Sequence, residues 1–155
     1  ANLLKQAAPD CIAVFVDYGQ EARLRELRAV LNICSYFDIE VRIERIEPIP
    51  IVDGTGDIVA GRNLRLIAQA IPIAVGAGAS EIQIGTTDLD FEDFPDCRPS
   101  FIEAISAATQ SAYGVRVTAP LKTRPSYLVA GTWSCYGAGP DPCGVCRSCR
   151  QGYQT

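Results

Sequence analysis

The stretch CIAVFVDYG, residues 11–19, decides the fold class. It is a run of apolar and β-branched residues that closes on Asp-Tyr-Gly, which is typical of a buried strand that ends in a turn. In residues 21–37, EARLRELRAVLNICSYF, leucine, valine and cysteine recur at helical spacing with charged residues between them. This spacing predicts an amphipathic helix. A buried strand followed by such a helix begins the alternation of an α/β chain.

The alternation of strand and helix continues toward the C-terminus. Further strands are predicted over residues 39–46, 81–85 and 115–121. Further helices are predicted over residues 62–79, which Pro72 should kink or restart, and 98–113, which Pro99 opens. Residues 1–10 are expected to end a helix, and residues 47–61 to form a loop. The pattern predicts an α/β fold with a doubly wound parallel sheet.

The composition describes a globular chain and argues against two classes of partner. With 155 residues, 48% of them hydrophobic and 21% charged, the chain is long enough to bury one core. The formal net charge of -4 argues against the broad basic surface with which nucleic-acid-binding proteins contact phosphates. The sequence contains no apolar run of about 20 residues and no signal pattern at its start, so no membrane association and a cytoplasmic setting are expected.

Four of the seven cysteines lie in the C-terminal segment, with the spacing C-x7-C-x2-C-x2-C. In a reducing compartment, clustered cysteines are better explained as metal ligands than as disulfides. Zinc prefers a tetrahedron of thiolates, and a two-residue spacer lets two cysteines reach one ion, whereas an iron–sulfur cluster is the alternative. The spacing therefore predicts a structural zinc site formed by Cys135, Cys143, Cys146 and Cys149.

Polar residues follow three of the predicted strands, at residues 17–20, 85–88 and 118–123. In a doubly wound sheet, ligands bind beyond the carboxyl ends of the strands, although plain polar turns would have the same composition. The loop DLDFEDFPDCRPSF, residues 88–101, interleaves carboxylates with phenylalanines and an arginine. It is either a solvated acidic loop or part of a pocket for a flat, polar heterocycle.

FPDCRPSFIEA, residues 94–104, and TWSCYGAGPDPCGVCRSC, residues 132–149, strongly resemble the 7-cyano-7-deazaguanine synthase family of the queuosine and archaeosine precursor pathway. VDYGQ, GRNL and IGTTDLDFEDFPDCR occur in the order and approximate spacing of the corresponding family segments, so the resemblance covers nearly the whole chain. It implies a nucleotide α-hydrolase-like, Rossmann-like fold and an ATP-dependent ligase that uses Mg²⁺. Such a ligase adenylates 7-carboxy-7-deazaguanine, lets ammonia displace AMP to give an amide, and activates again to reach the nitrile.

The resemblance also implies roles for individual residues. It assigns zinc to Cys135, Cys143, Cys146 and Cys149, and the adenine and ribose to Val16, Asp17 and Tyr18. It places Arg62, Asn63 and Gly85 near the nucleotide, and Asp90, Phe94, Asp96 and Arg98 beside the deazaguanine. It identifies no catalytic residue. Members of the family often pair as homodimers.

The chain departs from the family in four places: two segments are missing or short, the basic and His residues that commonly follow DYGQ are lacking, and Thr87 stands where an Asn is usual. The Ser-Gly-Gly-x-Asp-Ser phosphate loop expected before residue 1 is absent, and the connection between residues 123 and 132 is short. Either segments of a longer protein are omitted, or the chain is a shortened, non-catalytic binding relative; in both cases the chain as given is expected to be inactive.

Two further alternatives stay open beside the synthase activity. A related ligase would pass the activated carboxylate to another amine, and a zinc-stapled nucleic-acid module is disfavoured by the acidic charge. We expect residues 1–130 to form the nucleotide-binding-like α/β domain and residues 131–155 to form a zinc-binding segment packed on it.

Overall fold

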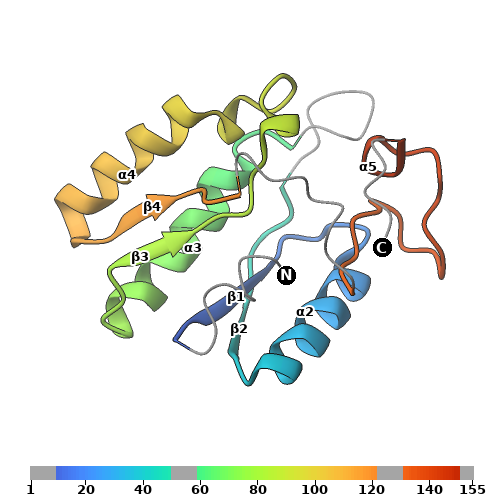
Figure 1. Ribbon diagram of the computed structural model, residues 1–155, viewed down its shortest axis with the longest axis horizontal. Helices are drawn as coiled ribbons and strands as arrows, with labels where there is room; N and C mark the ends of the chain where they lie inside the picture. Colours follow the sequence, from blue (N-terminus) through green and yellow to red (C-terminus); the bar gives the residue numbers. More distant parts are fainter. Residues whose placement is uncertain (1–9, 50–58, 122–130, 151–155) are drawn as a thin grey trace. The chain divides into compact units, whose positions relative to one another are not determined.

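The computed structural model describes residues 10–49, 59–121 and 131–150 (Figure 1). The chain divides into two compact units, one of residues 1–49 with 126–155 and the other of residues 50–125. The expected helix end over residues 1–9 lies outside the described residues, as do residues 50–58 of the predicted loop and the short connection after residue 121.

In the first unit, two parallel strands are joined by one helix. Strand β1 (Ile12–Asp17) pairs with β2 (Glu40–Arg45), and the crossover between them is α2 (Arg23–Phe37) (Figure 1). A core of Ala13, Cys34 and Ile39 forms where α2 packs on the strands, which explains the apolar spacing of both segments. All three elements predicted over residues 11–46 are therefore confirmed.

Helix α2 ends at Asp38, the one non-glycine residue among the described residues with a positive φ, at 54°. Its backbone N–H and that of Ile39 both donate to the Cys34 carbonyl oxygen, so the last turn of the helix is closed. Aspartate tolerates this left-handed conformation better than most side chains do. The turn directs the chain straight into β2.

In the second unit, two helices pack on one face of a short parallel pair of strands. Helices α3 (Arg62–Gly76) and α4 (Pro99–Tyr113) accompany β3 (Glu81–Gln83) and β4 (Arg116–Thr118) (Figure 1). Ile67 of α3, Ile102 of α4 and Val117 of β4 form the buried core. Helix α3 continues through Pro72 as one element, so the predicted restart at this proline is wrong. A missing N–H at one position removes one helical hydrogen bond, which the packing of the helix tolerates.

Three short helical turns complete the described chain: η1 (Asp88–Asp90), η2 (Pro95–Cys97) and α5 (Arg147–Arg150). The described strands form two separate two-stranded parallel sheets, β1–β2 and β3–β4. The parallel α/β alternation is thus confirmed, whereas a single doubly wound sheet stays a prediction. No helix in the described part of the chain combines the length and apolar character that a membrane span requires.

Candidate functional site

The four C-terminal cysteines converge on one point. The sulfur atoms of Cys135, Cys143, Cys146 and Cys149 all lie within 4.8 Å of one another. Four thiolates around one zinc ion at about 2.3 Å would stand roughly 3.8 Å apart, so the observed group needs only a small contraction to close on an ion. The arrangement confirms that the sequence spacing brings four possible metal ligands together.

Backbone N–H groups in this segment point at the sulfur atoms. The Cys135 sulfur accepts hydrogen bonds from the backbone N–H groups of Gly137 and Cys143, and the Cys143 sulfur accepts one from Cys146, each at 3.3 Å. Gly144, between the second and third of the four cysteines, has a φ of +72°, which favours glycine over residues with a side chain. These donors stabilise thiolate charge before any cation is bound.

The thiols of the cluster differ in how readily they ionise. Hydrogen bonds from the backbone N–H groups of Val145 and Cys146 lower the pKa of Cys143 to about 6. Burial raises the pKa of Cys149 to about 12. One thiolate therefore forms easily, but further ionisation in the same small volume needs a compensating cation. The donor set fits a metal that binds four thiolates, and such a site leaves no position open for substrate.

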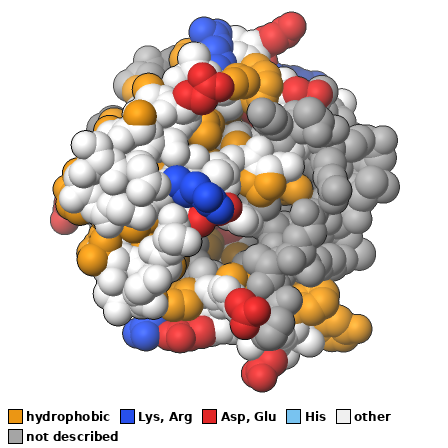
Figure 2. Space-filling view, turned by 60° about the vertical axis from the view of Figure 1, so that its left-hand side comes forward, with side chains coloured by type: hydrophobic (Ala, Val, Ile, Leu, Met, Phe, Trp, Pro, Cys, Tyr) orange, Lys and Arg blue, Asp and Glu red, His pale blue; other side chains and the backbone are white. Residues whose placement is uncertain are grey.

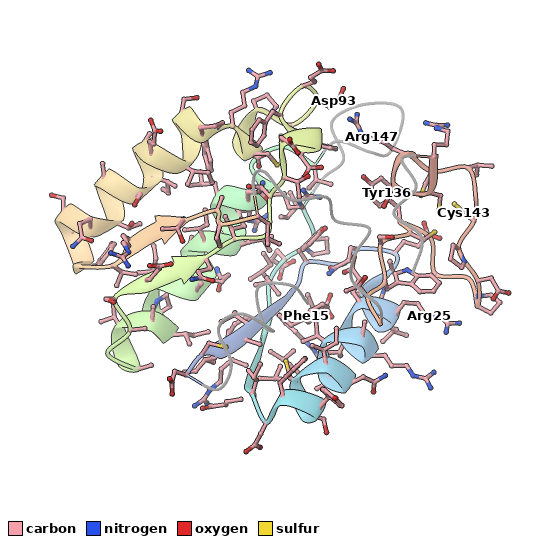
Figure 3. All side chains as sticks on the ribbon, in the orientation of Figure 1. Phe15, Arg25, Asp93, Tyr136, Cys143 and Arg147 are labelled. Carbon is pink, nitrogen blue, oxygen red and sulfur yellow. The ribbon has the colours of Figure 1, made fainter. Side chains whose placement is uncertain are left out.

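An aromatic contact holds this segment on α2. The guanidinium carbon of Arg25 lies 5.4 Å from the ring centroid of Trp133, which is a cation–π distance. Figure 3 shows Arg25 on α2, and Tyr136, Cys143 and Arg147 on the C-terminal segment of the same unit. The metal-ligand segment is thus attached to the helix that follows the first strand.

The carboxyl end of β1 carries the three residues expected beside the adenine and ribose. Val16 is buried, and its carbonyl oxygen accepts a hydrogen bond from the Gln20 side-chain amide at 3.3 Å. The Asp17 carboxylate accepts from the Gly19 N–H, and the Gln20 side-chain oxygen accepts from the Tyr18 N–H, both at 3.0 Å. Gln20, for which no role was predicted from the sequence, therefore stabilises this turn by bonding to the backbone of both Val16 and Tyr18.

Asn63 joins the start of α3 to η2. Its side-chain amide donates to the Asp96 carbonyl oxygen at 3.1 Å and to the Cys97 sulfur at 3.2 Å, and its backbone N–H donates to the Asp96 carboxylate at 3.0 Å. Beside it, the Arg62 guanidinium lies 5.7 Å from the centroid of the Phe94 ring. The structure thus brings together Arg62, Asn63, Phe94 and Asp96, which the resemblance had divided between nucleotide and deazaguanine.

Asp90 and Arg98 make hydrogen bonds within their own loop. The Asp90 carboxylate accepts from the backbone N–H and the hydroxyl of Thr87, at 3.0 and 2.9 Å. Arg98 donates to the carbonyl oxygens of Phe91 and Glu92, at 2.8 and 3.3 Å. Both charged groups therefore shape the loop of residues 87–98.

Cys97 is a further member of this cluster, and no role was predicted for it from the sequence. Burial, followed by the charges of Asp90 and Asp96, raises the pKa of the Cys97 thiol to about 11. The thiol is therefore protonated at neutral pH, which excludes a thiolate nucleophile there without a further change. Its position inside the PDCRP motif was the only signal in the sequence.

The carboxyl end of β3 leads into Gly85, which is exposed, and then Thr86, which is 5% exposed. The Thr86 hydroxyl oxygen is buried and has no hydrogen-bond partner among the described residues. Such a group at a strand end is one that a bound ligand can satisfy. Thr86 belongs to the GTTD turn that the sequence indicated, but its unpaired hydroxyl is visible only in the structure.

The surface drawn in Figure 2 bears on the nucleic-acid alternative. Among the described residues on this face, basic side chains stand apart from one another and have acidic ones near them. A phosphate-binding surface would gather them in a stripe. This face therefore gives no support to a nucleic-acid-binding module.

Comparisons with known proteins identify relatives over nearly the whole chain. The family model described as "Queuosine biosynthesis protein QueC" matches residues 48–155. The 7-cyano-7-deazaguanine synthase of Synechococcus sp. (strain RCC307) is 32% identical over 188 aligned positions, which cover 97% of this chain and 84% of the relative. The synthase of Synechococcus elongatus (strain ATCC 33912 / PCC 7942 / FACHB-805) is 32% identical, over 91% of this chain and 77% of the relative. An alignment of 188 positions exceeds the 155 residues of the chain, so the first relative has internal segments that this chain lacks.

A solved structure supports the same fold. The U34-tRNA thiolase NcsA from Methanococcus maripaludis, with its 4Fe-4S cluster, superposes with a TM-score of 0.54 over 97% of this chain and 56% of that chain. At 16% sequence identity, the likeness shows a shared fold and carries no statement about reaction or ligand.

Proposed function

Because the chain belongs to the QueC family, we propose that it is a 7-cyano-7-deazaguanine synthase that uses ATP, Mg²⁺ and ammonia to convert 7-carboxy-7-deazaguanine into the nitrile. The observation that carries this proposal is the 32% identity to such a synthase over 97% of the chain. The convergence of the four cysteines of the family motif supports it. The cytoplasm, where ATP is abundant and thiols stay reduced, is the proposed setting.

The proposed chemistry follows from the poor reactivity of a carboxylate. A carboxylate oxygen attacks the α-phosphorus of ATP and releases pyrophosphate, which leaves an acyl adenylate. Ammonia then attacks the acyl carbon, and AMP departs with the formation of an amide. Attack by the amide oxygen on a second ATP releases pyrophosphate again. Loss of AMP and a proton from that adduct completes the nitrile.

We assign the site residues in two groups within this proposal. The nucleotide group consists of Val16, Asp17, Tyr18, Arg62, Asn63 and Gly85. The deazaguanine group consists of Asp90, Phe94, Asp96 and Arg98. The strand-end position of Val16 to Tyr18 and the buried, unpaired Thr86 hydroxyl beside Gly85 support the first group. The cation–π contact of Arg62 with Phe94 and the hydrogen bonds between Asn63 and Asp96 each join a residue of the nucleotide group to one of the deazaguanine group. These contacts support a single cluster that serves both ligands.

We propose that the metal of the four cysteines is zinc. A closed set of four thiolates with N–H donors is the arrangement that structural zinc sites use, and the zinc would staple the segment of residues 131–155 onto the α/β domain. Metal analysis of the purified protein tests this assignment. We expect one zinc per chain, and iron with acid-labile sulfide would overturn it.

The activity is tested by incubating the metal-loaded, full-length protein with ATP, Mg²⁺, ammonium and 7-carboxy-7-deazaguanine, followed by mass spectrometry. We expect a product that carries the nitrile, with two AMP released per product. A deazaguanine adduct on another amine would indicate the related ligase, and no consumption of ATP would indicate a shortened binding relative. We also propose that the protein pairs as a homodimer, as members of the family often do, and light scattering of the same sample tests this.

A further inference from the structure

A cavity of about 440 Å³ lies in the second unit, beside α4 and β4. Phe91, Cys97, Ile102, Glu103, Ser106 and Val117 are among the residues that line it. None of the residues assigned to nucleotide or deazaguanine lines this cavity. Its volume falls in the range that small-molecule sites occupy, about 300–1,000 Å³.

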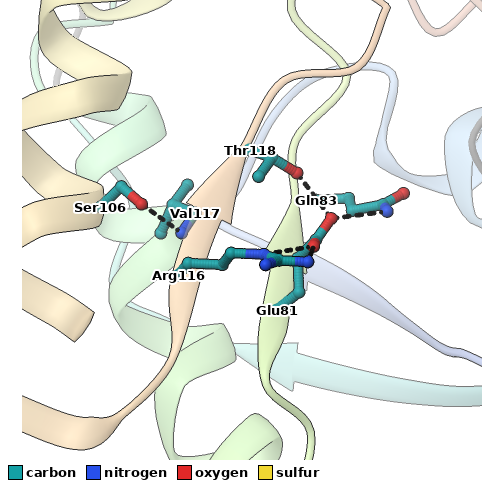
Figure 4. Close-up of polar contacts among 6 residues, drawn as sticks. All are labelled: Glu81, Gln83, Ser106, Arg116, Val117 and Thr118. Atoms are coloured by element: carbon teal, nitrogen blue, oxygen red, sulfur yellow. Dashed lines mark hydrogen bonds and ion pairs between the residues drawn. The ribbon is translucent and has the colours of Figure 1, made fainter.

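The hydrogen bond between Ser106 and Val117 shows how α4 and β4, which both line the cavity, are aligned along each other. The Ser106 hydroxyl oxygen accepts a hydrogen bond from the Val117 N–H at 2.9 Å (Figure 4). The chain reverses through Gly114 between α4 and β4, so the two elements run in opposite directions. Glu103 is one turn before Ser106, which places it about 4.5 Å further toward the carboxyl end of β4. Ligands of parallel sheets bind beyond that end.

Glu103 differs from the carboxylates that the sequence reading favoured. Asp90 is occupied by Thr87, and Asp96 is occupied by Asn63. Glu103 lines the cavity, and within the described part of the chain its carboxylate makes no hydrogen bond and no ion pair. Of the three carboxylates, only that of Glu103 is therefore available without breaking a contact of the fold.

The walls near Glu103 suit a planar ring. Half-buried Phe91 contributes an aromatic residue to the lining, whereas Ile102 and Val117 are 7% and 2% exposed and lie mostly in the core behind it. The thiol of Cys97 is uncharged at neutral pH because burial raises its pKa to about 11, so it adds no charge to the cavity. The cavity is open to solvent on the side of Glu103, whose side chain is exposed, so a ring that lies against these walls keeps its polar edge free to meet the carboxylate.

We propose that this cavity binds the 2-aminopyrimidinone ring of the substrate and that Glu103 accepts hydrogen bonds from its ring N–H and its 2-amino group. A carboxylate matches two parallel N–H donors, and such charge-assisted pairs are roughly twice as strong as neutral ones. The carboxyl group to be activated is on the five-membered ring, at the opposite side of the bicycle. This half of the substrate would lie outside the cavity, beside the loop that contributes Phe91 and Cys97 to its lining and that also carries the deazaguanine group of the proposed function. This inference rests on the proposed function, because it specifies how that substrate is recognised.

The test is isothermal titration calorimetry of the metal-loaded full chain with 7-carboxy-7-deazaguanine. Glu103→Gln should weaken binding roughly 10- to 100-fold, since hydrogen bonds to a charged group contribute about 1.5–3 kcal/mol and 1.4 kcal/mol is tenfold in Kd. Glu92→Gln, which alters an exposed carboxylate of the neighbouring loop that does not line the cavity, should leave Kd unchanged. Thermal unfolding of both variants shows whether the fold is intact.

An analogue without the 2-amino group, 7-carboxy-7-deazahypoxanthine, makes the test specific. It should bind the unaltered protein more weakly than the full substrate, and Glu103→Gln should cost clearly less affinity for it. Equal losses for both ligands, or an unchanged Kd for the substrate, would overturn the role of Glu103 while leaving the synthase proposal intact. If the unaltered protein does not bind 7-carboxy-7-deazaguanine at all, the proposed function fails, and this inference fails with it.

Discussion

Cys143 of the four-cysteine cluster and the single Cys97 of the second unit place the same thiol group in opposite electrostatic surroundings. In the cluster, backbone N–H groups point at sulfur and lower the pKa of Cys143 to about 6. At Cys97, burial and two nearby carboxylates raise the pKa to about 11. The comparison teaches that one chain uses cysteine both as an ionisable metal ligand and as a neutral, buried hydrogen-bond acceptor.

The largest expected effect is at the metal cluster. Cys146→Ser removes one of four ligands, so we expect loss of the bound metal and destabilisation of the first unit by several kcal/mol, because metal binding and folding are coupled in such sites. Metal content by mass spectrometry and the unfolding midpoint measure the two effects. Cys11→Ser, which alters a cysteine outside the cluster, should retain the metal.

A second prediction concerns the reactivity of Cys97 at pH 8. A pKa of about 11 against the ordinary 9.0 lowers the thiolate fraction about a hundredfold, and thiolate is the reactive form. Alkylation of Cys97 by iodoacetamide, followed by peptide mass spectrometry, should therefore be at least about 100-fold slower in the folded protein than in urea. Equal alkylation rates in the folded protein and in urea would show that the fold does not suppress the reactivity of the Cys97 thiol.

The third prediction removes the donor that faces Cys97. Asn63→Ala deletes the two side-chain hydrogen bonds to Asp96 and Cys97 and leaves their acceptors buried, which should cost about 2 kcal/mol of unfolding free energy. Unfolding in urea measures this change in the free energy of unfolding. Asn32→Ala, at an exposed position of α2, serves as the matched control and should change the free energy by less than about 0.5 kcal/mol. Similar small effects for both variants would contradict a structural role for Asn63.

The smallest effect on stability is expected at Glu81 of β3, which is only partly buried. It provides a baseline for the buried cluster around Cys97. Burial would raise the pKa of Glu81, but hydrogen bonds from Thr118, Gln83 and Arg116 lower it overall (Figure 4). A lowered carboxyl pKa stabilises the fold above the unfolded pKa and stops doing so as the pH falls through the folded value. Glu81→Gln should cost up to about 1 kcal/mol at pH 7 and progressively less as the pH falls below the unfolded carboxyl pKa, as measured by urea unfolding over a series of acidic pH values. If Glu81→Gln cost more stability in acid than at pH 7, the folded state would raise the pKa of Glu81 instead of lowering it, and this prediction would be wrong.

Local patterns predicted most of the fold because they depend on neighbouring residues. A continuous apolar run located β1, imperfect alternation located β2, helical patterns located α2, α3 and α4, and cysteine spacing located the metal cluster. Pro72 was misjudged, since the packing of α3 outweighs one lost hydrogen bond.

Contacts between distant residues could not be predicted in the same way. Asn63 meets Asp96 and Cys97 across 33 and 34 positions of the chain, and no local pattern encodes such a contact. The resemblance selected Asn63 and Asp96 for ligands, but the bonds between them exist only in the folded chain. The role of Gln20 was missed although its contacts are local, because an amide side chain in a turn has many possible partners.

The hydrogen bond from Val117 to Ser106 also affects how this protein meets other chains. Arg116 donates to Ser80 and Thr118 accepts from Ile84, so the N–H of Val117 points away from β3, toward the outer edge of β4. An unpaired N–H at a sheet edge is a template for strand addition and aggregation. Because a hydroxyl of α4 already occupies this N–H, the helix shields the outer edge of β4 from recruiting a foreign strand.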